Sequence, residues 1–115
     1  MQYNKNRIEV TEGQTIQLTL KHGGQLPKEA MGHNWVLLKQ GTDMVDFATK
    51  AIAAKDSDYI PAGSEASIIA NTKMIGGGES TNIEFTAPGP GEYDFLCTFP
   101  GHYAMMKGKF VVKAK

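Results

Sequence analysis

The chain has 115 residues, and its 12 Lys and Arg balance its 12 Asp and Glu, so the formal net charge is zero. This length is typical of one domain, and folding would remove roughly 65% of the surface from water, so we expect a single domain over residues 1–115. The charge balance argues against nucleic acid and anionic membranes as partners. No apolar run approaches the roughly 18 residues that span a bilayer. Because the polar start of the sequence is unlike a signal peptide, any targeting segment is expected to lie outside it.

Short runs in which apolar and polar residues alternate, separated by Gly and Pro, predict an all-β sandwich or barrel. The first two strands are expected around Ile8–Val10 and Ile16–Leu20, where every second residue is apolar. Residues 35–38 are apolar without interruption, which is typical of a strand that is covered on both faces. Later strands are expected at 67–72, 83–85, 93–97 and 109–113, with glycine-rich connections at 76–78 and 88–91.

One segment follows a helical period instead of the alternation of a strand. From Thr42 to Ala54, apolar residues recur at the spacing of one helix face. Thr42 or Asp43 is available as the N-cap of such a helix. We therefore predict an all-β fold with one short helix inserted between strands.

The single cysteine, Cys97, excludes an internal disulfide, a four-cysteine zinc site and a CxxC redox pair. A lone cysteine is in most proteins an inert buried residue. Cys97 differs because His102 and Met106 follow it closely, across a turn at Pro100-Gly101. Soft sulfur ligands together with imidazole favour copper, and two His with one Cys and a weak axial Met form the blue-copper ligand set.

The second imidazole has to come from elsewhere, and His33 offers one at the start of an apolar strand. Strand alternation indicates whether these groups can converge. Cys97 is in phase with the apolar residues of its strand, so its sulfur is expected to point into the core. His33 is in phase with Trp35, and Met106 is in phase with the apolar face of the last strand. Met105 is out of phase, so the alternation favours Met106 as the thioether ligand.

Three stretches are typical of one known family, and each contains a candidate ligand: Gly32-His33-Asn34-Trp35-Val36-Leu37, Cys97-Thr98-Phe99-Pro100-Gly101-His102 and Met106-Lys107-Gly108. Through them the chain resembles the azurins, which are cupredoxins with a type 1 (blue) copper. Weaker similarity extends over nearly the whole chain. Four residues lie between the cysteine and the histidine, and three between that histidine and the methionine. Plastocyanin-like loops are shorter between Cys and His, so this spacing is typical of azurin.

The resemblance implies a set of copper ligands and a function. It makes Cys97, His33 and His102 the equatorial ligands and Met106 a weak axial ligand. On the opposite side it places the backbone carbonyl of Gly32, where the missing side chain permits close approach. It further implies a Greek-key cupredoxin β-sandwich, one copper that cycles between Cu(I) and Cu(II), electron transport without catalysis, and a periplasmic or otherwise extracytoplasmic location.

Two polar residues near the candidate ligands have alternative interpretations. By the resemblance, Asn34 ties the strand of His33 to the loop of Cys97, while a simple turn-forming asparagine is the alternative. His22 is expected near the site without being a ligand. It is either an ordinary histidine at the end of a strand or a residue that couples protonation to the redox state.

Apolar residues flank the ligands and are expected to surround the edge of His102: Leu26, Ala30, Met31, Phe99, Pro100, Ala104 and Met105. Scattered apolar residues are ordinary on protein surfaces, but a contiguous patch usually marks a docking surface. The expected partners are redox proteins of the cytochrome or reductase kind. Because His102 is on a loop, we expect it to be the ligand that lies nearest the surface.

Three other functions are compatible with parts of this pattern. A copper oxidase or nitrite reductase needs an additional histidine-rich centre, and the chain has three histidines in total. A copper carrier or storage protein would favour an exposed Met cluster over ligands on separate strands. A zinc-binding or metal-free module would lack the absorption band at about 600 nm that a Cu(II)-thiolate site gives.

Overall fold

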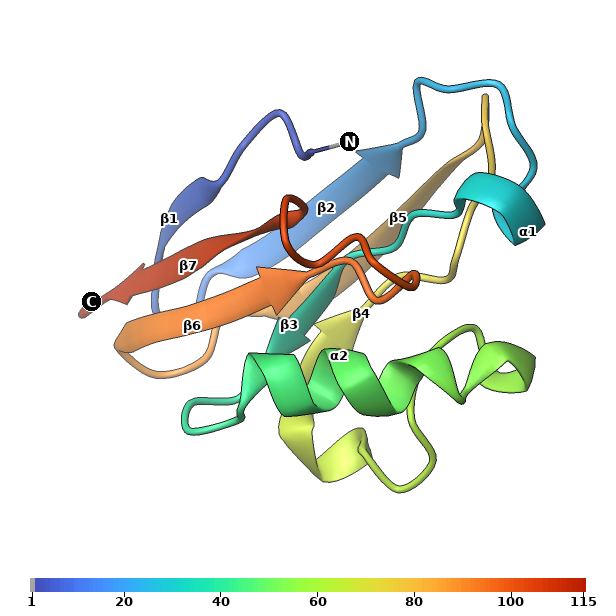
Figure 1. Cartoon of the computed structure of the whole chain (residues 1–115). Coiled ribbons are helices and arrows are strands. Elements are labelled where there is room, and N and C mark those ends of the chain that lie inside the picture. Colours follow the sequence, from blue (N-terminus) through green and yellow to red (C-terminus); the bar gives the residue numbers. More distant parts are fainter. Residues whose placement is uncertain (1) are drawn as a thin grey trace.

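A computed structural model describes residues 2–115 and consists mainly of strands (Figure 1). The strands are β1 (Arg7–Thr11), β2 (Thr15–Lys21), β3 (Val36–Leu38), β4 (Ile68–Asn71), β5 (Ser80–Thr86), β6 (Gly91–Leu96) and β7 (Lys107–Lys113). The helices are α1 (Lys28–Met31) and α2 (Met44–Ile52), with single 3-10 turns η1 (Lys55–Ser57) and η2 (Glu65–Ser67). Within residues 2–115, no helix has the length and apolar character needed to cross a membrane.

The strands form two sheets that pack face to face as a sandwich. One sheet has the order β1-β7-β6-β3-β4, and the other consists of β2 and β5. All pairings are antiparallel except β1 with β7, which run parallel. The core between the sheets contains the buried residues Ile16, Leu20, Trp35, Leu37, Ile75, Ala87, Tyr93, Phe95, Phe110 and Val112. The predicted all-β sandwich is therefore confirmed.

The central strands β3 and β6 are covered on both faces. Leu37 and Phe95 face the sandwich core, whereas Val36, Leu38 and Leu96 belong to a second apolar cluster on the other face. Helix α2 covers that second cluster, as Figure 1 shows, and contributes Phe47 and Ala48 to it. This arrangement confirms that the uninterrupted apolar run at 35–38 is a strand with two buried faces.

Helix α2 begins where its capping residue predicts. The Asp43 side chain accepts a hydrogen bond from the backbone N–H of Asp46 at 3.1 Å, so Asp43 is the N-cap. The helix ends at Ile52, two residues before the predicted end at Ala54. Helix α1 and both 3-10 turns show no pattern in the sequence, because a single turn is too short to show a period.

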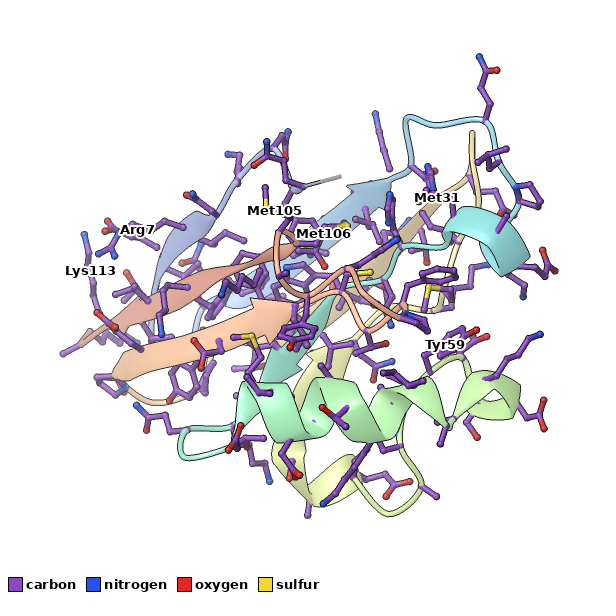
Figure 2. All side chains as sticks on the ribbon, in the orientation of Figure 1. Arg7, Met31, Tyr59, Met105, Met106 and Lys113 are labelled. Atoms are coloured by element: carbon purple, nitrogen blue, oxygen red, sulfur yellow. The ribbon has the colours of Figure 1, made fainter. Side chains whose placement is uncertain are left out.

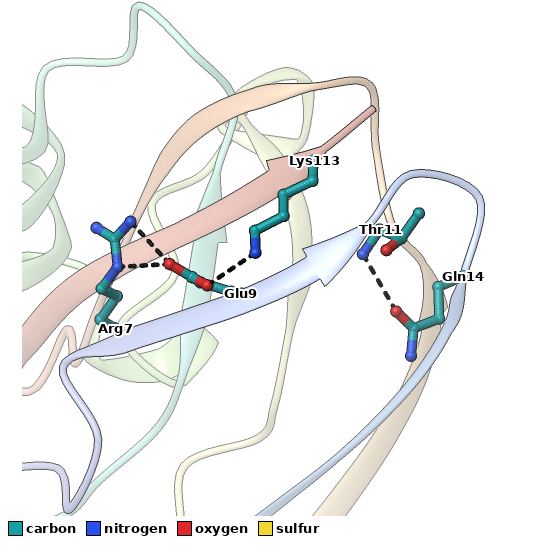
Figure 3. Close-up of polar contacts among 5 residues, drawn as sticks. All are labelled: Arg7, Glu9, Thr11, Gln14 and Lys113. Carbon is teal, nitrogen blue, oxygen red and sulfur yellow. Dashed lines mark hydrogen bonds and ion pairs between the residues drawn. The ribbon is translucent and has the colours of Figure 1, made fainter. Parts of the chain in front are cut away.

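Strand β1 pairs with β7 along its backbone, and exposed ion pairs lie along the same edge (Figure 3). Glu9 lies 2.9 Å from Arg7 and 3.2 Å from Lys113, which is on the neighbouring strand. The backbone N–H of Thr11 donates to the Gln14 side chain at 3.2 Å, across the turn that leads into β2. Exposed ion pairs are weak, so the backbone ladder and the apolar face of β1 account for its position.

We predict that Gly108→Ala destabilises the fold, because an added Cβ at this position in β7 would collide with the Asn6 carbonyl oxygen and the Phe95 ring. Overpacking of this kind costs about 1–3 kcal/mol of unfolding free energy, which urea denaturation measures. Gly89→Ala is the matched control, because nothing lies within 4 Å of a Cβ there. Equal stability of the two variants would show that β7 can move away from Phe95.

Candidate metal centre

His33 and Cys97 are anchored by backbone hydrogen bonds next to neighbouring strands. His33 precedes β3 and exchanges two backbone hydrogen bonds with Ile75, at 3.0 and 2.9 Å. Cys97 follows β6 directly, and its N–H donates to the Met106 carbonyl at 3.0 Å. Because β3 and β6 pair with each other, the side chains of His33 and Cys97 start from adjacent strands.

His102 lies on the loop between β6 and β7, and the loop is closed by its own backbone. The His102 N–H donates to the Phe99 carbonyl at 3.0 Å, and the Met106 N–H donates to the His102 carbonyl at 2.8 Å. Gly101 has φ +82°, a left-handed conformation that glycine adopts at little cost. The turn at Gly101 thus returns the chain, so that His102 faces Cys97.

These three residues place their donor atoms close together. One donor atom each from His33, Cys97 and His102 lies within 4.8 Å of the other two. The Cys97 Sγ is 3.7 Å from His102 Nδ1, and the His33 and His102 ring centroids are 5.1 Å apart. Among residues 2–115, this is the one group of three or more His, Cys or acidic side chains with such spacing.

The donor atoms also have unmet bonding capacity. His33 Nδ1 is buried and has no hydrogen-bond partner. A buried polar atom in this state costs free energy, and a metal ion at the centre of the group would give it a ligand bond. The Cys97 sulfur makes long contacts, 3.7 Å to His102 Nδ1 and 3.9 Å to the Gly32 carbonyl oxygen. A thiol with two imidazoles is a donor set that suits copper, so the residues present fit a copper ion.

Burial sets the protonation of the three donors. Desolvation lowers the pKa of His33 to about 4, helped by the neighbouring His22 and His102, and burial also lowers the pKa of His102. Both imidazoles are therefore neutral at pH 7, with a lone pair free. Burial raises the pKa of the Cys97 thiol to about 11, against the opposing effect of the Asn34 and Phe99 backbone N–H groups. The thiol therefore keeps its proton until a metal displaces it.

The two adjacent methionines have opposite environments, and Figure 2 shows both beside the ligand loop. Met106 is 2% exposed, whereas Met105 is 63% exposed. Met106 and His33 line the same pocket of about 550 Å³, together with Tyr3 and Met31. The alternation of β7 therefore extends back to Met106, and the predicted inward orientation of this residue is confirmed.

Gly32 fits its place because it has no side chain. A Cβ there would lie 2.8 Å from the Lys28 carbonyl oxygen and 2.9 Å from the Met74 sulfur. These contacts are too close for any larger residue unless α1 or Met74 shifts. The Gly32 carbonyl can consequently face Cys97 from the end of α1.

Asn34 connects the two ligand-bearing strands through its side chain. Its Nδ2 donates to Thr98 Oγ1 and its Oδ1 accepts from the Thr98 N–H, both at 2.8 Å. The Tyr3 hydroxyl donates to the Asn34 backbone carbonyl. The predicted tie between the His33 strand and the Cys97 loop is thus confirmed. The sequence did not identify Thr98 as the partner of Asn34. A polar residue directly after Cys97, at the end of a buried strand, could have indicated it.

His22 lies beside the metal centre with both ring nitrogens occupied. Nδ1 accepts from the Gly24 N–H at 3.0 Å, and Nε2 lies 2.6 Å from the Met31 carbonyl oxygen, which can only accept. With these partners, Nε2 is the donor and Nδ1 is the acceptor. The ring stacks on His33, with centroids 4.1 Å apart. His22 is therefore near the site, as expected, and is not free to bind a metal.

The exposure of the ligands differs from the expectation that His102 is nearest the surface. His102 is 5% exposed, whereas His33 is partly exposed and lines the pocket that contains Met31. The reason is that the Phe99 ring packs on His102, with centroids 4.6 Å apart. Tyr59, which no sequence pattern connects to this loop, packs in turn on Phe99.

The comparisons with known proteins agree with this geometry. Residues 1–113 match the family described as copper binding proteins, plastocyanin/azurin family. The chain is 44% identical over 118 residues to the azurin of Pseudomonas fluorescens biotype C, covering 98% of this chain and 91% of the azurin. It is 42% identical over 112 residues to outer membrane protein H.8 of Neisseria meningitidis serogroup B, covering 95% of this chain and 60% of that protein.

A solved structure extends the agreement to three dimensions. Dithionite-reduced auracyanin from the photosynthetic bacterium Roseiflexus castenholzii superposes with a TM-score of 0.85 at 44% identity, covering 96% of this chain and 86% of auracyanin. Fold, donor group and sequence thus point to one kind of protein. The chain belongs to the plastocyanin/azurin family of copper-binding proteins and is an electron-transfer protein with a type 1 copper.

Proposed function

We propose that the copper is bound by the Cys97 sulfur and the imidazoles of His33 and His102, with Met106 as a weak axial ligand and the Gly32 carbonyl opposite. The observation that carries this assignment is the convergence of the three strong donors within 4.8 Å. Copper supplies the redox chemistry, because it gains and loses one electron between Cu(II) and Cu(I). The contact of 3.9 Å between the Cys97 sulfur and the Gly32 carbonyl supports the position of the latter.

The role of the protein is to keep these donors in place in both oxidation states. His33 is held by two backbone bonds to Ile75, and Cys97 by one to Met106. Because these bonds hold the backbone of His33 and Cys97, a change of one charge can move these two ligands only slightly. A small rearrangement favours fast electron transfer.

We infer further that the chain carries electrons and catalyses no reaction of its own. A copper oxidase or nitrite reductase would need a second metal centre with its own histidines. The third histidine, His22, has hydrogen-bond partners at both ring nitrogens, so it would have to break these bonds to bind a metal. This supports the role of electron carrier that the family implies.

We infer that residues 1–115 form a single domain that acts in the periplasm or another extracytoplasmic compartment. The two apolar clusters lie on opposite faces of the same strands, β3 and β6, which supports one cooperative unit. The relative named outer membrane protein H.8 supports a location outside the cytoplasm.

We propose that redox partners, of the cytochrome or reductase kind, dock on the apolar patch around His102. Leu26 is 52% exposed and Met105 is 63% exposed, and Ala30 and Ala104 are also exposed. A partner can dock on apolar side chains without removing charged groups from water, which would cost free energy. Transfer then occurs over the short distance from the loop surface to the covered His102 ring.

The assignment of Cys97 predicts that Cys97→Ser loses the intense visible band at about 600 nm, because its thiolate is the donor that gives type 1 copper its colour. The variant should still fold, which circular dichroism of the metal-free protein checks. A Cys97→Ser protein with the wild-type spectrum would contradict the ligand assignment. A colourless wild-type protein loaded with Cu(II) would favour a zinc site.

The axial assignment predicts different effects for the two neighbouring methionines. Met106→Leu should keep the visible band and raise the reduction potential, because loss of the thioether destabilises Cu(II) more than Cu(I). Met105→Leu is the matched control and should change neither property, since Met105 points to solvent. Voltammetry measures both potentials. A large shift in Met105→Leu with none in Met106→Leu would contradict the assignment.

The docking proposal predicts that a charge placed in the patch slows electron self-exchange. Met105→Glu and Met31→Lys should each lower the rate at low salt and leave the spectrum largely intact, because an unpaired charge is costly to desolvate in an encounter. Like charges then meet across the pair of molecules, so added salt should partly restore the rate. NMR line broadening at two ionic strengths measures the exchange.

The two variants also separate two routes to the copper. Met105 lies on the loop of His102, whereas Met31 lines the pocket in which His33 is partly exposed. Slowing by Met31→Lys alone would favour a route through that pocket. Unchanged rates in both variants would exclude this face as the docking surface.

A further inference from the structure

The connection between η1 and β4 contains a strained turn of two residues. Asp58 has φ 55° and Tyr59 has φ 60°, and neither is glycine. The left-handed region is costly for a bulky residue such as Tyr. The conformation is held because the Tyr59 N–H donates to the Ala54 carbonyl at 2.9 Å and the Ile60 N–H donates to the Ser57 carbonyl at 3.0 Å. Because these hydrogen bonds maintain a strained backbone, we expect the position of the Tyr59 side chain to serve a function.

The turn directs the Tyr59 ring toward the ligand loop, as Figure 2 shows. The centroid of the Tyr59 ring is 5.4 Å from that of Phe99, at an interplanar angle of 59°. The Phe99 ring is in turn 4.6 Å from the His102 ring, at an angle of 37°. Phe99 is therefore in contact with an aromatic ring of a remote segment and with the candidate ligand. The three rings form a continuous row of tilted ring contacts that ends at the metal centre.

These ring contacts restrain His102, which is held less firmly by backbone hydrogen bonds to other segments than His33 and Cys97 are. His33 is bonded to Ile75, and Thr98, which directly follows Cys97, is bonded to Asn34. The backbone bonds of His102, in contrast, lie within its own loop, to Phe99, Met105 and Met106. Such local bonds keep the shape of the loop but do not fix it against the rest of the protein. Tyr59 supplies a contact from outside, because it comes from the connection between β3 and β4.

We propose that Tyr59 is a positioning residue for the metal centre, whose ring holds Phe99 against His102 and so keeps that imidazole ready to bind copper. The inference rests on the proposed function, since it takes His102 as a ligand. The Tyr59 ring alone makes the contact with Phe99, so the Tyr59 hydroxyl is not required for this role. These ring contacts stabilise the copper-bound arrangement by restricting His102 before the metal arrives.

The test compares three variants of the whole chain. Tyr59→Leu removes the ring and should lower the affinity for Cu(I) and Cu(II) about two- to tenfold, the range that one aromatic pair contributes. Its EPR spectrum should broaden, because His102 then samples several orientations. Tyr59→Phe keeps the ring and should match wild type. Asp58→Gly keeps both the ring and the left-handed turn, so its copper affinity should also match wild type.

The measurements are competition titrations with a chelator, EPR of the Cu(II) form and thermal unfolding of the metal-free form. A lower thermal midpoint in Tyr59→Leu, with wild-type affinity and EPR, would reduce Tyr59 to a purely structural role and overturn the proposal. If Tyr59→Leu does not fold, NMR of wild-type Cu(I) protein decides, because missing cross-peaks between the Tyr59 and Phe99 rings would overturn it. A wild-type protein without the blue band would instead overturn the ligand assignment, and the inference with it.

Discussion

The metal centre depends on one pair of buried side chains that joins two segments distant in the sequence. Asn34 and Thr98 exchange two hydrogen bonds of 2.8 Å, and they are 0% and 2% exposed. Asn34 directly follows His33, and Thr98 directly follows Cys97, so this pair fixes the separation of two donors. Water cannot replace these bonds at such burial, and breaking one would leave a buried polar group unpaired. The amide side chain is therefore a structural requirement of the centre.

Strand alternation predicted the orientation of two side chains of the centre from the sequence, whereas the ligand set came from the resemblance to the azurins. It placed the Cys97 sulfur in the core and separated Met106 from Met105, and both orientations agree with the observed burial. The reason is physical, because the side-chain period of a strand is two and a slip by one residue would expose the whole apolar face. The run at 35–38 likewise indicated two covered faces before the position of α2 was known.

The features of the metal centre that the sequence did not predict depend on contacts between separate segments. The covering of His102 results from Phe99, whose ring orientation is set together with that of Tyr59. The pocket that exposes His33 lies between the N-terminal segment, β2 and the end of α1. No local period encodes such contacts, since they arise only when the loops pack. Local patterns therefore identified the donors but ranked their exposure wrongly.

The donors are brought together at a cost in stability that the bound metal offsets. His33 Nδ1 is buried without a partner, and the burial that lowers its pKa to about 4 also keeps the imidazole neutral at pH 7. The Cys97 thiol has a pKa raised to about 11 and must give up its proton on binding. A ligand that binds only the folded state stabilises it by mass action, so the metal-free protein is the less stable form. We expect the same arrangement that leaves His33 Nδ1 unpaired to limit the movement of the donors when one electron is gained or lost.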